Sequence, residues 1–139
     1  MKKIHITFDE IEILEWYDGI VRATCKAENE IYLLILVAWD MKQLMKLSIL
    51  LKLDESTKND ITKELGSNRS KEENWKRFNL IFDDYVRSYA GEAYLIQGEI
   101  KENKTYNLKI INSNYIKNLA TYEFEDTMSR DNINFWLKM

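Results

Sequence analysis

Residues 11–39 read IEILEWYDGIVRATCKAENEIYLLILVAW, and the rest of the fold is expected to pack on this stretch. Asp18-Gly19 is a turn signal, because glycine reaches positive φ at no steric cost and aspartate tolerates it. Glu28-Asn29-Glu30 is a second turn signal. The two turns divide the stretch into three predicted strands, over 11–17, 20–27 and 31–39. The last strand carries no charge, which is typical of a central strand covered on both faces.

The next segment, 41–53, fits two patterns. Its first part has helical spacing, with Met41, Leu44 and Met45 on one side. From residue 46 onward, residues pointing to one face are all apolar and most of their neighbours are polar. This alternation is the clearer pattern, so we expect a fourth strand over 46–53.

Two helices are predicted after this strand. Asp54 or Ser56 can cap a short helix that ends near Leu65, with Gly66 as its stop. Ser70 and Glu73 form a capping box for a longer helix over 71–90, which Gly91 ends. Its apolar residues share one face, typical of packing on a sheet rather than of a ligand cleft: Trp75, Phe78, Phe82, Tyr85, Val86 and Tyr89. Three i,i+4 ion pairs support it: Glu72–Lys76, Glu73–Arg77 and Asp83–Arg87.

The remaining segments complete the predicted fold. We expect a short strand over 4–8, a second hairpin over 94–111 with its turn at 101–104, a last strand over 119–124, and a C-terminal helix through Ile133, Trp136 and Leu137 capped by Thr127 or Ser129. The prediction is a single α+β domain over 1–139. Its antiparallel sheet has five or more strands, with one main helix (about 71–90) packed on one face.

Composition limits the class of protein. The chain has 139 residues, 45% apolar and 31% charged, as expected for a globular domain. The longest charge-free apolar run is nine residues, too short to span a bilayer. With no visible signal peptide and a single cysteine, Cys25, we expect a cytoplasmic protein that does not act at a membrane. A net charge of −3 argues against nucleic acid as partner.

The first hairpin is strongly acidic. Its residues 9–30 hold seven acids: Asp9, Glu10, Glu12, Glu15, Asp18, Glu28 and Glu30. Like charges this close repel each other, which a basic partner would relieve. The predicted partner-binding residues are Glu12, Trp16, Tyr17, Asp18, Glu28 and Glu30, with Trp16 or Tyr17 as apolar anchor. The alternative is an ordinary solvated face.

Few residues are candidates for catalysis or metal binding. Glu99-Ile100-Lys101, with Asp83 or Asp84, has the residue types of a metal-dependent nuclease, although we expect both aspartates on a helix. His5 is the only histidine, and Cys25 is expected to be a small buried hydrophobe. The last candidate is an acidic cluster spaced to share a hard cation, although a solvated strand is the commoner outcome: Glu123, Glu125 and Asp126. Without a glycine-rich phosphate loop or histidine cluster, we expect neither cofactor nor metal.

The stretch from Leu14 to Ile20, followed by Ile31-Tyr32-Leu33-Leu34, resembles the start of a bacterial family of unknown function. Members open with a Tyr-Asp-Gly-Pro turn, a strand and a Tyr-Leu strand; Ile20 stands in place of the proline. The resemblance covers about the first third of the chain and implies an α+β fold. In size and composition the chain is also similar to phage anti-defence inhibitors and toxin-immunity proteins.

These observations favour a non-enzymatic bacterial or phage binding protein that inhibits or masks a protein partner with a basic surface. One alternative is a module that sequesters a small anionic ligand, such as a nucleotide signal, in the groove of a homodimer. The other alternative is a metal-dependent nuclease that uses Glu99 and Lys101.

Overall fold

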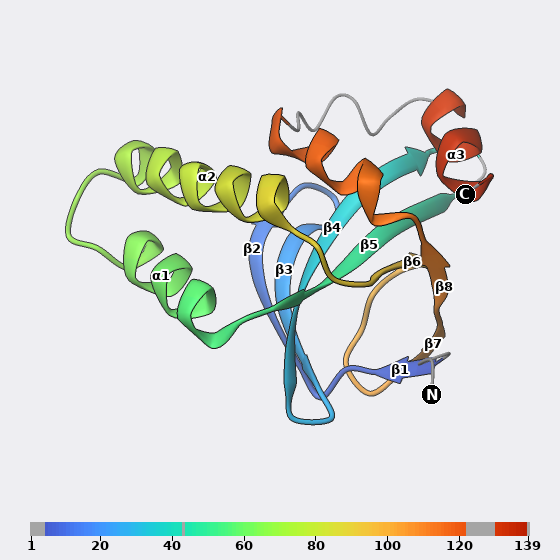
Figure 1. Ribbon diagram of the computed structural model, residues 1–139, viewed down its shortest axis with the longest axis horizontal. Coiled ribbons are helices and arrows are strands. Elements are labelled where there is room, and N and C mark those ends of the chain that lie inside the picture. Colours follow the sequence, from blue (N-terminus) through green and yellow to red (C-terminus); the bar gives the residue numbers. More distant parts are fainter. Residues whose placement is uncertain (1–4, 43, 122–129, 139) are drawn as a thin grey trace.

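A six-stranded antiparallel sheet in the order β2-β3-β4-β5-β6-β8 forms the centre of the computed structural model (Figure 1). The structure describes residues 5–42, 44–121 and 130–138. The chain is a single α+β domain, as predicted, with helices packed against the sheet. The elements are β1 (His5–Thr7), β2 (Glu10–Trp16), β3 (Ile20–Ala27), β4 (Glu30–Asp40), β5 (Met45–Leu53), α1 (Glu55–Leu65), α2 (Lys71–Ser88), β6 (Ala93–Gln97), β7 (Thr105–Asn107), β8 (Lys109–Ile111), the 3-10 helix η1 (Ser113–Thr121) and α3 (Arg130–Leu137).

The predicted three-strand meander is confirmed as β2, β3 and β4. Asp18 and Gly19 take positive φ values of 52° and 139° in the first turn, and Glu28 and Asn29 take 53° and 65° in the second. Residues 32–39 of β4 are all buried, so this strand is central and covered on both faces. The segment after it is also a strand, β5, and its helical spacing has no counterpart in the structure.

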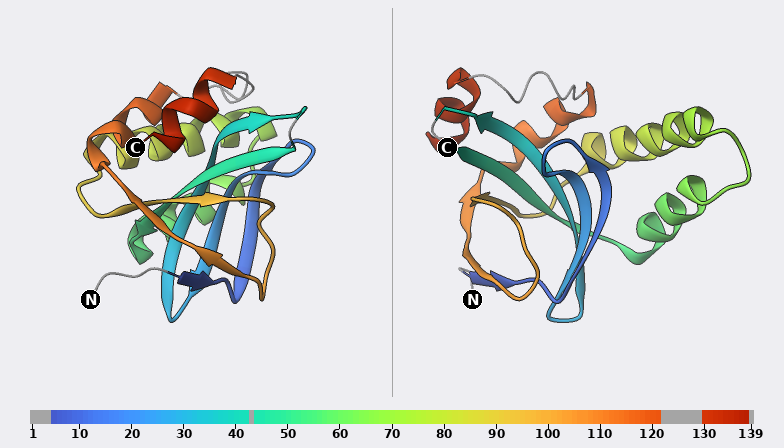
Figure 2. Two further views of the ribbon diagram at one scale, coloured as in Figure 1. Left: turned by 90° about the vertical axis from the view of Figure 1, so that its right-hand side faces the viewer. Right: turned by 180° about the vertical axis from the view of Figure 1, so that it is seen from behind.

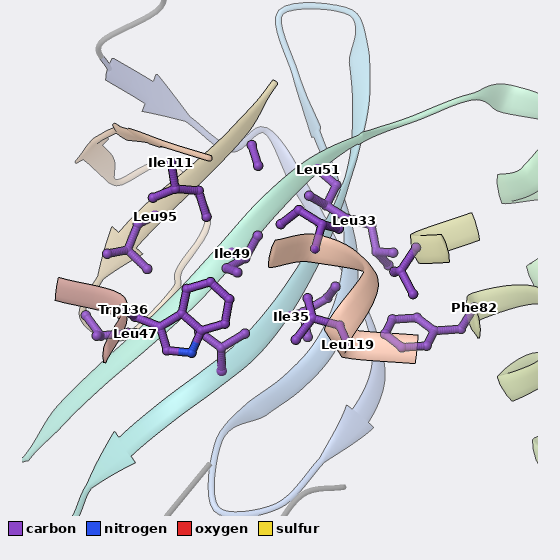
Figure 3. Packing of buried hydrophobic residues seen from close by; sticks show 14 of the residues in the cluster. Leu33, Ile35, Leu47, Ile49, Leu51, Phe82, Leu95, Ile111, Leu119 and Trp136 are labelled. Atoms are coloured by element: carbon purple, nitrogen blue, oxygen red, sulfur yellow. The ribbon is translucent and has the colours of Figure 1, made fainter. Parts of the chain in front are cut away.

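One face of the sheet packs against the helices. Leu33, Ile35, Ile49 and Leu51 from β4 and β5 contribute to this core, and Phe82 of α2 points toward it (Figure 3). As the sequence predicted, the apolar face of α2 supplies buried residues: Phe78, Phe82 and Val86. Residues from η1 and α3 complete this layer, among them Ile116, Leu119, Ile133 and Trp136.

The other face of the sheet is covered by the short strands β1 and β7 and not by helices. β1 pairs with β7 in a separate two-stranded sheet (Figure 2), which lies against this face. The second core therefore joins Ile6 and Phe8 to sheet residues such as Leu34 and Leu50. Because both faces are covered, the sheet itself is accessible to other molecules at its edges and turns.

Several local predictions need correction. Residues 119–121 belong to η1 and not to a strand; the rest of the predicted 119–124 strand, and the proposed caps Thr127 and Ser129, lie outside the described residues. The 94–111 hairpin is shorter than expected, because β6 pairs with β8 only over Ala93–Leu95 while β7 pairs with β1. Helix α2 ends at Ser88, before Gly91, with Tyr89 as its C-cap.

The helix caps agree better with the predictions. Asp54 accepts a hydrogen bond from the Thr57 amide at the start of α1, and the Ser70 hydroxyl accepts one from the Glu73 amide in α2. The Glu73 carboxylate is bound by Arg77, one of the three predicted i,i+4 pairs. Within the described residues, no helix is long and apolar enough to cross a membrane.

Candidate partner-binding surface

The six predicted partner-binding residues do not lie together. Trp16, Tyr17 and Asp18 lie at the β2–β3 turn, with Trp16 as the last residue of β2. Glu28 and Glu30 lie at the β3–β4 turn at the other end of β3, with Glu30 as the first residue of β4. At about 3.3 Å per residue, the length of β3 separates these turns by roughly 25 Å. Glu12 lies between them on β2, an edge strand of the sheet. The structure thus brings three of the six residues together and places the other three elsewhere.

Most acids of the hairpin have basic partners within the chain. Four ion pairs neutralise them: Glu10–Lys26 (3.6 Å), Glu12–Lys58 (2.8 Å), Glu15–Arg22 (2.8 Å) and Glu30–Lys52 (2.9 Å). For four of the seven acids, the expected repulsion is therefore reduced by a basic residue of the same chain. An external basic partner is not required to explain them.

Exposed apolar residues lie in two turns at the end of the sheet that holds the β2–β3 turn. The side chains of Trp16 and Tyr17 are 64% and 59% exposed, and in the β4–β5 turn Met41 and Leu44 are 54% and 86% exposed. Both turns lie at the same end of the antiparallel sheet, with the β4–β5 hairpin reaching further outward (Figure 2). We call these four residues the turn surface.

A buried lysine fixes the chain beneath the turn surface. Only 9% of the Lys46 side chain is exposed. Its Nζ donates to the backbone oxygen of Asp18 at 3.0 Å, pairs with Oε1 of Glu99 at 2.9 Å, and lies 4.5 Å from the centre of the Trp39 ring. Burying an ammonium is unfavourable unless such partners compensate, and Lys46 has three. We call this set the Lys46 clamp.

Both the backbone conformation of the turn and the clamp favour glycine at position 19. A Cβ on Gly19 would lie 2.3 Å from Nζ of Lys46, and the φ of +139° is itself unfavourable for other residues. The loop on the far side of the clamp is also tied to β5, since the Gly98 amide donates to the backbone oxygen of Lys46 at 2.9 Å. The β2–β3 turn, strand β5 and the 98–99 loop are therefore held in one arrangement.

The nuclease candidates do not converge. Glu99 binds Lys46, while Asp83 and Asp84 lie on α2. Burial raises the pKa of the Asp83 carboxyl, against the opposing effect of Arg87 and Arg22. No group of three acidic, histidine or cysteine side chains in the described part of the chain could hold a metal ion.

The other candidate nucleophiles and bases give no site. His5 is exposed on β1 opposite Asn107. Cys25 is buried, and burial raises the pKa of its thiol to about 12, so the neutral form dominates. The acidic residues Glu123, Glu125 and Asp126 lie outside the described residues.

The sequence predicted half of the turn surface, Trp16 and Tyr17, but not Met41 and Leu44. Met41 and Leu44 fit a helical spacing in the sequence, whereas in the structure they lie in the turn between β4 and β5. The burial of Lys46 left no sequence signal, because a lysine in a strand ordinarily points to solvent.

No protein-family model, curated protein or solved structure matches this chain. The resemblance of its first third to a bacterial family therefore stays a prediction, and function has to be argued from the geometry of the surface.

Proposed function

We propose that this chain is a non-enzymatic binding protein of bacterial or phage origin, of the anti-defence or immunity type, that masks a protein partner with a basic surface. The observation that carries the proposal is the exposure of Trp16 and Tyr17 on a turn fixed from below by the Lys46 clamp. Interface energy concentrates in such aromatic anchors, and a turn already held in place loses little freedom on binding.

The charges around the turn surface favour a basic partner. Asp18 is exposed, and its carboxylate has no cation within 4 Å among the described residues. Glu99 is paired with Lys46 but keeps 60% of its side chain exposed. A lysine or arginine of the partner, placed beside the aromatic anchors, would add charge complementarity to apolar contact.

The binding test has two steps. The tagged chain carrying a photo-crosslinking residue at position 17 is used in the native host to recover a partner. The purified partner is then titrated against Trp16→Ser and Leu44→Ser, with Leu80→Ser as matched control; Leu80 is 67% exposed but lies on α2. Loss of a central aromatic anchor is expected to weaken binding by more than about tenfold. Binding that is equal in all three variants would refute this surface.

Association kinetics can show which of the two turns at the ends of β3 contacts the partner. Asp18→Lys should slow association at low salt and have a smaller effect at high salt, because screening weakens steering. Glu28→Lys, at the opposite turn, serves as the control for net charge. If both reversals slow association equally, long-range charge rather than the turn surface guides the partner.

A further inference from the structure

Beside β6, the six-stranded sheet and the two-stranded β1–β7 sheet diverge, and a groove lies between them. β6 pairs with β8 as far as Leu95 opposite Lys109, after which the neighbouring chain leaves to become β7 and pairs with β1. Between the diverging strands lies a cavity of about 550 Å³. That volume falls within the range of roughly 300–1,000 Å³ that is typical of small-ligand pockets.

The interior of this groove is apolar. Leu47 of β5 and Leu95 of β6 line it and are almost fully buried. Leu137 of α3 closes one side and is 38% exposed. The aliphatic or aromatic part of a ligand would cover Leu137 and the edges of the groove and shield them from water.

The charged residues of the groove favour an anion, because both are lysines. Its lining includes Lys104 and Lys109 together with neutral polar residues, and it contains no aspartate or glutamate. In a chain of net charge −3, this is a local reversal of sign. Among the described residues, neither ammonium has a carboxylate within 4 Å.

Both ammonium groups are held by contacts within the chain and still have hydrogens to donate. Nζ of Lys109 donates to the backbone oxygen of Leu137 at 2.6 Å, and Nζ of Lys104 lies 5.2 Å from the centre of the Tyr106 ring. Lysine carries three donors, so Lys109 keeps two for an anionic head group. The exposed amide of Gln97 lines the same groove and can orient a polar ligand edge.

We propose that the β6–β7 groove binds a small amphipathic anion, with an apolar body against Leu47, Leu95 and Leu137 and a single carboxylate or phosphate at Lys104 and Lys109. This site is separate from the turn surface and does not depend on a protein partner. Two sources share this chemistry, an alkyl carboxylate and a nucleoside monophosphate, and decanoate and adenosine monophosphate serve as their probes.

The test is an NMR titration of the full chain, following the backbone amides of Gln97 and residues 104–109. We expect at least one probe to shift these amides with saturation, whereas decanol and inorganic phosphate, which each lack half of the pattern, should bind at least about tenfold more weakly. The better probe identifies the ligand body. If neither probe shifts these amides, the proposal is wrong.

Paired variants test the role of the lysines. Lys104→Gln with Lys109→Gln should weaken binding of the better probe at least about tenfold, because both charged donors to the anionic head group are lost. The matched control is Lys101→Gln with Lys117→Gln, two exposed lysines outside the groove. Unchanged affinity in the first pair, or equal loss in both pairs, would overturn the assignment.

Discussion

Arg22 offers the sharpest test of how the helix layer is attached to the sheet. Its guanidinium, which is almost fully buried on β3, donates to Glu15 and to Asn79 of α2, each at 2.8 Å. It also lies 4.7–4.9 Å from the ring centres of Trp75, Phe78 and Phe82. We predict that Arg22→Lys destabilises the protein more than Arg22→Met does.

The magnitudes follow from the contacts. Two charge-assisted hydrogen bonds contribute about 1.5–3 kcal/mol each, and the ring contacts add roughly 0.5–2 kcal/mol. Arg22→Met loses these terms but avoids the desolvation of the guanidinium, which costs several kcal/mol. The Glu15 carboxylate that it leaves unpaired is 25% exposed and can regain water, so the net loss should be about 2–3 kcal/mol. Arg22→Lys keeps a buried charge without the planar fork that reaches both partners, and should lose about 3–5 kcal/mol.

Urea denaturation near neutral pH measures both changes, provided that the slope m stays at its wild-type value. For a chain of 139 residues, each kcal/mol corresponds to roughly 3–4 °C in Tm. Arg77→Met is the control, because the exposed Arg77–Glu73 pair should be worth less than about 0.5 kcal/mol. If Arg22→Lys proves more stable than Arg22→Met, Arg22 acts as a generic positive charge and the reasoning fails.

Four further outcomes are expected. Phe82→Ala should cost about 3–5 kcal/mol, and a melting temperature within a degree or two of wild type would place the ring outside the core. Gly19→Ala should cost about 1–3 kcal/mol and alter NMR signals across the Lys46 clamp; unchanged signals would show that the clamp does not constrain the turn. Because Cys25 is buried and burial raises the pKa of its thiol to about 12, it should react with iodoacetamide far more slowly in the folded chain than in denaturant near pH 8, and equal rates would show that the thiol is accessible. The double variant Glu99→Ala, Lys101→Ala should match wild type in nuclease assays with Mg²⁺ or Mn²⁺, and metal-dependent cleavage that disappears in the variant would restore the nuclease hypothesis.

The repetitive features of the sequence predicted the fold well. Alternation, two turn signals and a capping box were enough to place β2 to β5 and the start of α2, because each is determined by neighbours within a few residues. The error at residues 119–121 has a different cause. Leu119 and Ala120 are buried against the helix-face core, so tertiary packing selected a 3-10 helix where local alternation suggested a strand.

The candidate site was less predictable, because it depends on contacts between distant segments. Lys46 meets Glu99 across 53 positions of sequence, and Glu12 meets Lys58 across 46. Periodicity within one strand contains no information about such pairs. Trp16 and Tyr17, predicted as apolar anchor of a partner-binding surface, are exposed beside the Asp18-Gly19 turn, and their role in binding stays a prediction.

The acidity of the first hairpin has a simpler explanation than a partner. Strand β2 is the last strand on its side of the described sheet, and an unpaired strand edge is a template for aggregation. Glu10, Glu12 and Glu15 place charge along that edge, and their cations come from the neighbouring strand β3 and from α1. The same residues thus discourage edge pairing and attach a helix to the sheet. Acid density in a hairpin is therefore weak evidence for a basic partner. The argument for a binding function rests instead on the turn surface, where apolar side chains are exposed on a turn held by a buried lysine.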